Sequence, residues 1–202
     1  MKTDGALIIF VRNPTLGRVK TRLAKTIGDE KALQVYKDLL YHTMTVTQKI
    51  NCDKFVFYDS AIESDDIWPN NLFEKRLQHG ADLGSKMQNA FHNLFNLGYK
   101  NCIIIGSDLF DLQTKHITDG FAILQTKDVV IGPAEDGGYY LLGLKKVIPT
   151  LFLNKKWGTE TVLKDTIKDL ETVSVSFLEI LNDIDTAEDL EKSSYHNNTK
   201  NH

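Results

Sequence analysis

The stretch ALIIFVRNPTLGRVKTRLA, residues 6 to 24, decides how the rest of the sequence is interpreted. Residues 6–11 are all apolar, and an unbroken run of this kind indicates a strand buried on both faces, as in a parallel sheet. A turn with proline and glycine follows at once and carries the cations Arg12, Arg18, Lys20 and Arg22. Two interpretations are open for this turn: a solvated basic loop, or a loop that binds phosphate groups.

The composition is that of an ordinary globular protein. Of the 202 residues, 42% are hydrophobic and 25% are charged, and the formal net charge is -3. We therefore expect a single domain over residues 1–192 and a polar, disordered tail over 193–202. The near-neutral charge argues against a nucleic-acid partner, whereas a local basic loop suits a small anionic ligand. The sequence shows no signal peptide and no long apolar span, so we expect no membrane partner and a cytoplasmic location. It does not define an oligomeric state.

Apolar runs and helical spacings alternate along the chain. Further strands are predicted at 54–58, 102–106 and 128–132, and helices over residues 32–44, 83–94 and 114–124. This alternation predicts an open α/β sheet whose ligands lie at the carboxyl ends of the strands.

The pattern changes after residue 132. The run GGYYLLGL, 137–144, predicts a strand that closes an edge of the sheet, with an antiparallel direction considered for it. A helix over 159–170 and a short strand at 172–175 are predicted to follow.

Acidic residues follow the predicted strand at 102–106. Asp108 comes just past its carboxyl end, and Asp111 follows three residues later. A carboxylate in this place can hold a hard divalent ion such as Mg²⁺, which would bridge substrate phosphates. The alternative is that Ser107 or Asp108 only caps a turn.

Two later loops offer more carboxylates. After the strand at 128–132, Glu135 and Asp136 are predicted to bind substrate hydroxyls or to act as a base, unless they form a plain turn. In NDIDTAEDL, 182–190, Asp185 or Thr186 is a good helix N-cap. The competing interpretation is that Asp183 and Asp185 complete a metal site.

Six stretches, in this order along the chain, resemble one family: NPTLGRVKTRL, QHGADLGSKMQNAF (78–91), GSDLFDL, GPAEDGGYYLLGL, KWGTETVL (156–163) and DIDTAEDL. They resemble the DUF2064 group, also described as the radical-SAM/selenodomain-associated transferase 1 family, some of whose members are called arsenosugar-biosynthesis glycosyltransferases. This group belongs to the nucleotide-diphospho-sugar transferase (GT-A) superfamily, with MobA-like and phospholactate guanylyltransferase proteins. The resemblance spans about residues 5 to 190. Phe110 departs from it, because the family usually has proline there.

The resemblance implies a GT-A-like, three-layer α/β/α fold with a mostly parallel central sheet. It implies metal ligation by Asp108 and Asp185, with Mg²⁺ or Mn²⁺ as cofactor, and a catalytic role for Asp108 and Asp136. It implies substrate binding by Gly137 and Gly138. The positions that match its nucleotide-binding segments are Arg12, Gly17, Lys20, Arg22, Gln78, Gly80 and Gly84.

The expected activity is a metal-dependent transfer from a nucleotide-activated substrate. The first expectation is a glycosyltransferase that uses a nucleotide sugar and a small-molecule acceptor. A nucleotidyltransferase that uses a nucleoside triphosphate and releases pyrophosphate is the nearest alternative, and a non-catalytic nucleotide-binding protein is the third. The first loop has only Gly17 where a nucleotidyltransferase would have a glycine-rich segment, which favours glycosyl transfer.

Overall fold

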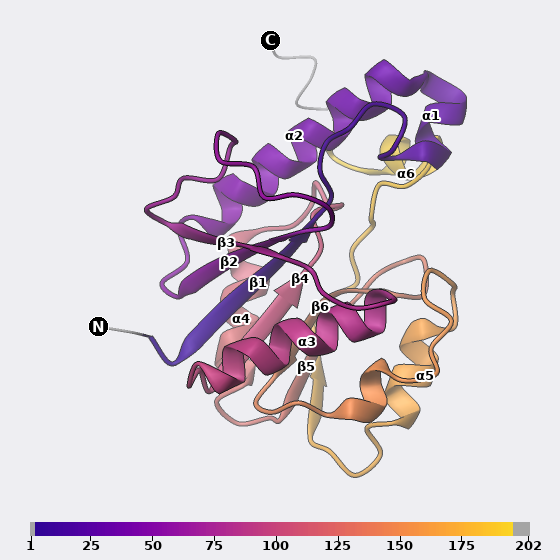
Figure 1. Ribbon diagram of the computed structural model, residues 1–202. Coiled ribbons are helices and arrows are strands. Elements are labelled where there is room, and N and C mark those ends of the chain that lie inside the picture. Colours follow the sequence, from indigo (N-terminus) through magenta and orange to yellow (C-terminus); the bar gives the residue numbers. More distant parts are fainter. Residues whose placement is uncertain (1–2, 196–202) are drawn as a thin grey trace.

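The structure is a computed structural model, and it describes residues 3–195. Its centre is a seven-stranded sheet with the strand order β3-β2-β1-β4-β6-β5-β7 (Figure 1). The strands are β1 (Gly5–Val11), β2 (Asp53–Tyr58), β3 (Phe73–Leu77), β4 (Asn101–Ile105), β5 (Val129–Pro133), β6 (Tyr139–Leu144) and β7 (Val175–Phe177).

The sheet is mostly parallel, as predicted. Only β6 runs antiparallel to its two neighbours, β4 and β5. The prediction that this strand closes an edge is wrong, because β6 lies inside the sheet and β3 and β7 form the edges. Its burial agrees with an interior place, since Leu141, Leu142 and Leu144 are fully buried.

Helices cover both faces of the sheet, which confirms the three-layer α/β/α class. They are α1 (Thr21–Ile27), α2 (Asp29–Thr47), α3 (Leu83–Asn96), α4 (Thr114–Ile123), the 3-10 helix η1 (Pro149–Phe152), α5 (Val162–Lys168) and α6 (Ala187–Lys192). Apolar residues of α2 and α4 form one core with the sheet, whereas α3 and η1 contribute to the core on the other face. None of the helices within residues 3–195 has the length and apolar character needed to cross a membrane.

A third cluster joins the C-terminal segment to the first helices. Leu23 of α1 and Leu39 of α2 pack with Ile184, Leu190 and Tyr195, and Figure 1 shows α6 beside α1. Residues 193–195 belong to the segment predicted to be a disordered tail. In the structure, Tyr195 is buried within this cluster. Residues 196–202 of the predicted tail lie outside the described residues.

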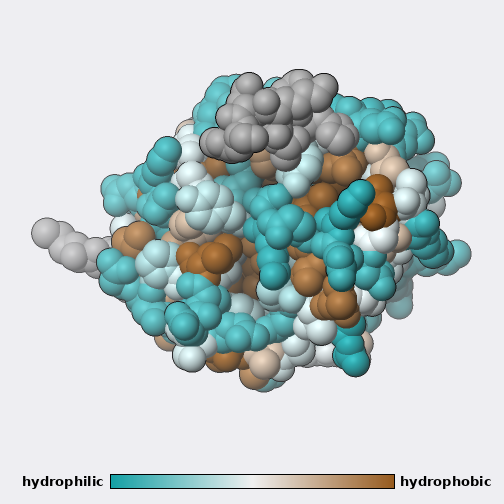
Figure 2. All heavy atoms as spheres, turned by 90° about the horizontal axis from the view of Figure 1, so that it is seen from above, coloured by the Kyte–Doolittle hydropathy of each residue, from teal (hydrophilic) through white to brown (hydrophobic). Residues whose placement is uncertain are grey.

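The end of the molecule near α1 and α6 has a mixed surface. Figure 2 shows several separate groups of apolar side chains between polar ones on the described part of this face. Such a surface offers polar and apolar groups to a ligand side by side.

Candidate functional site

A cavity of about 480 Å³ lies at the carboxyl ends of the central parallel strands. Its lining includes the ends of β1 and β4, the first turn of α3, the turn between β5 and β6, and the segment before α5. This is the edge of an α/β sheet at which ligands bind. Five of the residues predicted for the site line this cavity: Arg12, Gln78, Asp108, Asp136 and Gly138.

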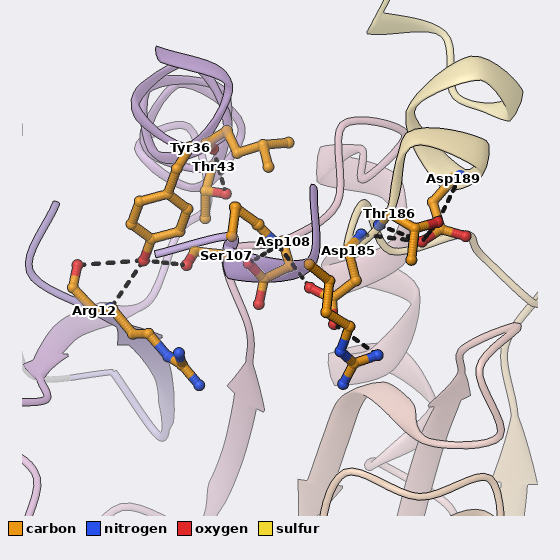
Figure 3. Close-up of polar contacts among 11 residues, drawn as sticks. Arg12, Tyr36, Thr43, Ser107, Asp108, Asp185, Thr186 and Asp189 are labelled. Carbon is orange, nitrogen blue, oxygen red and sulfur yellow. Dashed lines mark hydrogen bonds and ion pairs between the residues drawn. The ribbon is translucent and has the colours of Figure 1, made fainter. Parts of the chain in front are cut away.

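Beside this cavity, an aspartate from each of two loops forms an ion pair with the same lysine. The Nζ of Lys20 lies 2.5 Å from Oδ1 of Asp108 and 3.1 Å from Oδ1 of Asp185. Figure 3 shows that the two aspartates come from different segments of the chain and lie close to each other. The structure thus brings together the two carboxylates that the sequence predicts as metal ligands.

Lys20 differs from the expected open phosphate donor. Its side chain is only 3% exposed, and its backbone is left-handed, with a φ of 49°, at the N-cap of α1. Burial alone would lower the pKa of Lys20, but the carboxylates of Asp108 and Asp185 outweigh it and raise the pKa above its usual value. The ammonium is therefore held in its charged form between the two acids.

The position of Asp185 follows from how the chain enters α6. Thr186 is the N-cap, because its Oγ1 accepts a hydrogen bond from the backbone N–H of Asp189 and the Asp189 carboxylate accepts from the Thr186 N–H. Asp185 is therefore not the N-cap, and its carboxylate forms the ion pair with Lys20 instead. The backbone N–H of buried Ile184 donates to the carbonyl of Asp108 at 2.9 Å and fixes one loop against the other.

Asp183 also lines the cavity, although the residues implied by the resemblance did not include it. Burial, followed by the negative charges of Asp136, Asp185 and Asp108, raises its pKa to about 7. The carboxyl group of Asp183 thus faces more negative charge than Lys20 balances.

This raised pKa makes a prediction about stability. A folded-state pKa above the ordinary 3.8 means that stability is full below the ordinary value and falls as the pH rises through about 7. Asp183→Asn is therefore expected to raise the melting temperature more at pH 8 than at pH 5. The measurement is thermal unfolding with a chelator present, and an equal gain at both pH values would contradict the assigned cause.

Arg12 and Gln78 line the cavity near the ends of β1 and β2 and make different contacts there. The backbone N–H of Arg12 donates to the hydroxyl of buried Tyr36 at 2.8 Å, and its side chain is exposed at the lining. Gln78 donates through Nε2 to the carbonyls of Val11 and Phe57, at 3.1 and 2.9 Å. Gln78 thus ties the ends of β1 and β2, while the Arg12 guanidinium is available to a ligand.

The predicted glycines serve backbone geometry. A Cβ on Gly84 would lie 2.4 Å from the carbonyl oxygen of Phe152, so this glycine lets α3 pack against η1. Gly137 has a φ of 85°, and a Cβ there would lie 2.3 Å from the carbonyl oxygen of Glu160. The cavity lining includes Gly138 but neither Gly84 nor Gly137. It also omits Gly17, Lys20, Arg22, Gly80 and Asp185.

Other lining residues were missed by the sequence interpretation. Lys86 lies in the first turns of α3, and Trp157 belongs to the segment before α5. Both fall in stretches that carry the family resemblance, which was the available signal. Tyr139 also lines the cavity, and its buried hydroxyl has no hydrogen-bond partner within residues 3–195.

The described residues include no cluster of three or more histidine, cysteine, aspartate or glutamate side chains placed to hold a metal ion. A divalent ion at Asp108 and Asp185 would need further oxygen ligands from water or substrate phosphates, as is usual for Mg²⁺. The donor set fits such an ion, because the two carboxylates already share one cation.

Comparisons with known proteins agree with this architecture. Residues 42–159 match the model of a family described as an uncharacterized protein conserved in bacteria, DUF2064. A proposed nucleotide-diphospho-sugar transferase from Desulfovibrio desulfuricans G20 is 29% identical in sequence, with a TM-score of 0.89 over 100% of this chain and 89% of that one. No curated protein matches the sequence.

More distant solved structures share the fold alone. The 4-diphosphocytidyl-2C-methyl-D-erythritol synthase from Anaerococcus prevotii is 10% identical, with a TM-score of 0.62 over 96% of each chain. A CMP:2-keto-3-deoxy-manno-octonic acid synthetase complexed with CTP is 9% identical, with a TM-score of 0.58 over 98% of this chain and 100% of that one. Because the family model covers more than half of the sequence, the chain belongs to the DUF2064 family, and it has the fold of the nucleotide-diphospho-sugar transferases.

Proposed function

We propose that this protein transfers a glycosyl group from a nucleotide sugar to a small-molecule acceptor, with Mg²⁺ or Mn²⁺ as cofactor. One observation supports this proposal above the others: Asp108 and Asp185 converge beside a basic turn at the edge of a 480 Å³ cavity. Cations and metal-binding carboxylates are the groups that bind the diphosphate of a nucleotide sugar.

Asp108 and Asp185 are the residues that would hold the ion. When bound, the ion would supply positive charge that stabilises the leaving nucleoside diphosphate. Arg12 would add a charge-assisted contact to a phosphate, because its guanidinium is exposed at the cavity. Arg22 is also 63% exposed, and its Nη1 lies 3.7 Å from Oδ2 of Asp185.

Asp136 is the proposed base for the acceptor hydroxyl if the reaction inverts. Its Oδ1 accepts a hydrogen bond of 2.7 Å from the backbone N–H of Gly138, which fixes the carboxylate on the turn between β5 and β6. Oδ2 is the oxygen that would accept the proton from an acceptor bound in the cavity.

Nucleotidyl transfer is the second candidate. The similarity to a synthetase solved with CTP favours it, because that protein shares the fold over nearly its full length. The two reactions differ in their products: glycosyl transfer releases a nucleoside diphosphate or monophosphate, whereas nucleotidyl transfer releases pyrophosphate.

The test is a thermal-shift screen of nucleotide sugars and nucleoside triphosphates with and without Mn²⁺, followed by product analysis with the best ligand. A ligand at 100 times its dissociation constant adds about 2.7 kcal/mol of stability. We expect a nucleotide sugar to give the largest metal-dependent shift and to release its nucleotide. Release of pyrophosphate from a triphosphate would replace the proposal by the second candidate, and binding without turnover would indicate a non-catalytic protein.

A further inference from the structure

Lys20 places a positive charge where the proposed function needs a metal ion. Its Nζ lies within 3.1 Å of one oxygen from Asp108 and one from Asp185, and its side chain is almost fully buried. The same ammonium is 6.0 Å from the centre of the Tyr36 ring, which forms another wall of its pocket. The lysine is thus part of the folded interior, unlike an ordinary surface cation.

The ammonium and a divalent ion cannot both occupy this position. Mg²⁺ binds carboxylate oxygens at about 2.0–2.1 Å, which is closer than an ammonium approaches them, and two cations in contact repel each other. We propose that Lys20 is a resident cation that holds Asp108 and Asp185 together in the free protein, and that a divalent ion binds this pair only by displacing it. The inference rests on the proposed metal site and holds whichever group is transferred.

The surrounding charges explain why a resident cation is needed. The carboxylates of Asp108 and Asp185 both contact the same ammonium, at 2.5 and 3.1 Å, so without a cation between them these two like charges would repel each other. The left-handed backbone at Lys20 is unfavourable for a residue with a Cβ, and it persists where the surroundings hold it in place. The four-carbon stem of lysine is flexible, so the displacement that we propose moves the Lys20 side chain and not its backbone.

Displacement lowers the apparent affinity of the site for metal. The observed affinity for metal equals the intrinsic affinity multiplied by the fraction of molecules in which the carboxylate pair is free. If the ammonium occupies the pair nine-tenths of the time, the affinity for metal is about tenfold lower. Lys20→Met is therefore expected to bind Mn²⁺, without any nucleotide, at least about tenfold more tightly than wild type. Calorimetric titration with Mn²⁺ measures this directly.

Two control variants separate displacement from simpler effects. Lys75→Met removes another buried lysine, whose Nζ is 2.7 Å from Oδ1 of Asp66 and whose side chain is 8% exposed. Arg22→Met removes one positive charge near Asp185 without emptying the position that Lys20 fills. We expect Mn²⁺ affinities within about twofold of wild type for both. Lys75 pairs with Asp66 and not with the proposed metal ligands, and the exposed charge of Arg22 is screened by solvent.

Thermal unfolding gives a second readout. Without metal, Lys20→Met and Lys75→Met should both melt below wild type. The first leaves two carboxylates without their buried lysine, and the second leaves one. Mn²⁺ should reduce the difference in melting temperature between Lys20→Met and wild type, and it should leave the difference between Lys75→Met and wild type unchanged. Equal Mn²⁺ affinity in wild type and Lys20→Met, or no Mn²⁺ binding by either, would overturn the inference. Nucleotide binding by the wild type is measured separately, so the proposed function can survive that result.

An NMR titration of the wild-type protein tests the displacement without relying on the folding of any variant. The ¹⁵Nζ resonance of the buried Lys20 ammonium should shift when Mg²⁺ is added, while that of Lys75 stays in place. A Lys20 resonance that does not change at high Mg²⁺ would show that no ion displaces this side chain.

Discussion

Asp108→Asn is expected to fold like wild type and to catalyse transfer at least about 100-fold more slowly, the usual cost of losing one electrostatic contact to the reacting charge. The amide retains an oxygen that can accept a hydrogen bond from the Lys20 ammonium, and Asp185 still pairs with it at 3.1 Å. Folding should therefore suffer far less than catalysis. The measurement is release of the nucleotide product at saturating donor, with circular dichroism to follow unfolding.

Asp111→Asn is the matched control for this variant. Asp111 lies in the same loop, but its carboxylate accepts a hydrogen bond from Ser194 and the cavity lining does not include it. We expect its rate to stay within a few-fold of wild type. If Asp108→Asn were equally active and equally dependent on metal, Asp108 would lose its assignment as a metal ligand.

Gly84→Ala is expected to lower the melting temperature by roughly 4–8 °C for a chain of this size. Alanine gains about 1 kcal/mol in helix preference, whereas forcing its Cβ against a backbone carbonyl costs about 3 kcal/mol, so the net loss is about 2 kcal/mol. The neighbours are rigid: the added Cβ would lie 2.4 Å from the Phe152 oxygen and 2.7 Å from Nε1 of Trp157.

Gly106→Ala provides the comparison for Gly84→Ala. Gly106 has no positive φ, and a Cβ there would have no atom within 4 Å. Its melting temperature should stay near that of wild type. If Gly84→Ala melts like wild type and loses nucleotide affinity instead, the glycine serves the ligand and not the packing of α3.

Burial on both faces made the central strands predictable. The runs that contain Ile8, Val56, Ile104 and Val130 are apolar without interruption, and they became β1, β2, β4 and β5. Strand β3, with the sequence FEKRL, was missed because an edge strand carries charges and only Phe73 is buried in it. The interior place of β6 could not be derived, because an apolar strand pattern does not say which strands it pairs with.

The candidate site was predictable in its residue types and much less so in its contacts. The position of Asp108 after a buried strand was enough to place its carboxylate at the cavity. The burial of Lys20 was not foreseen, because a lysine in a polar turn gives no sign that two distant loops will enclose it. Likewise, only the path of the chain before α6 decides that Asp183 faces the cavity while Asp185 faces Lys20.

The docking of the C-terminal segment makes the site sensitive to partial unfolding. Asp185 reaches Lys20 across 165 positions of sequence, and it is held there by the packing of Ile184, Leu190 and Tyr195 on α1 and α2. Helix α6 has only six residues, of which Leu190 alone is buried, and segments with few buried apolar contacts open locally at the lowest free energy. Opening of this segment would leave the sheet and most of the cavity intact while removing one of the two carboxylates. During synthesis, too, the carboxylate pair can form only after Asp185 has been made, 165 positions after the lysine that it contacts.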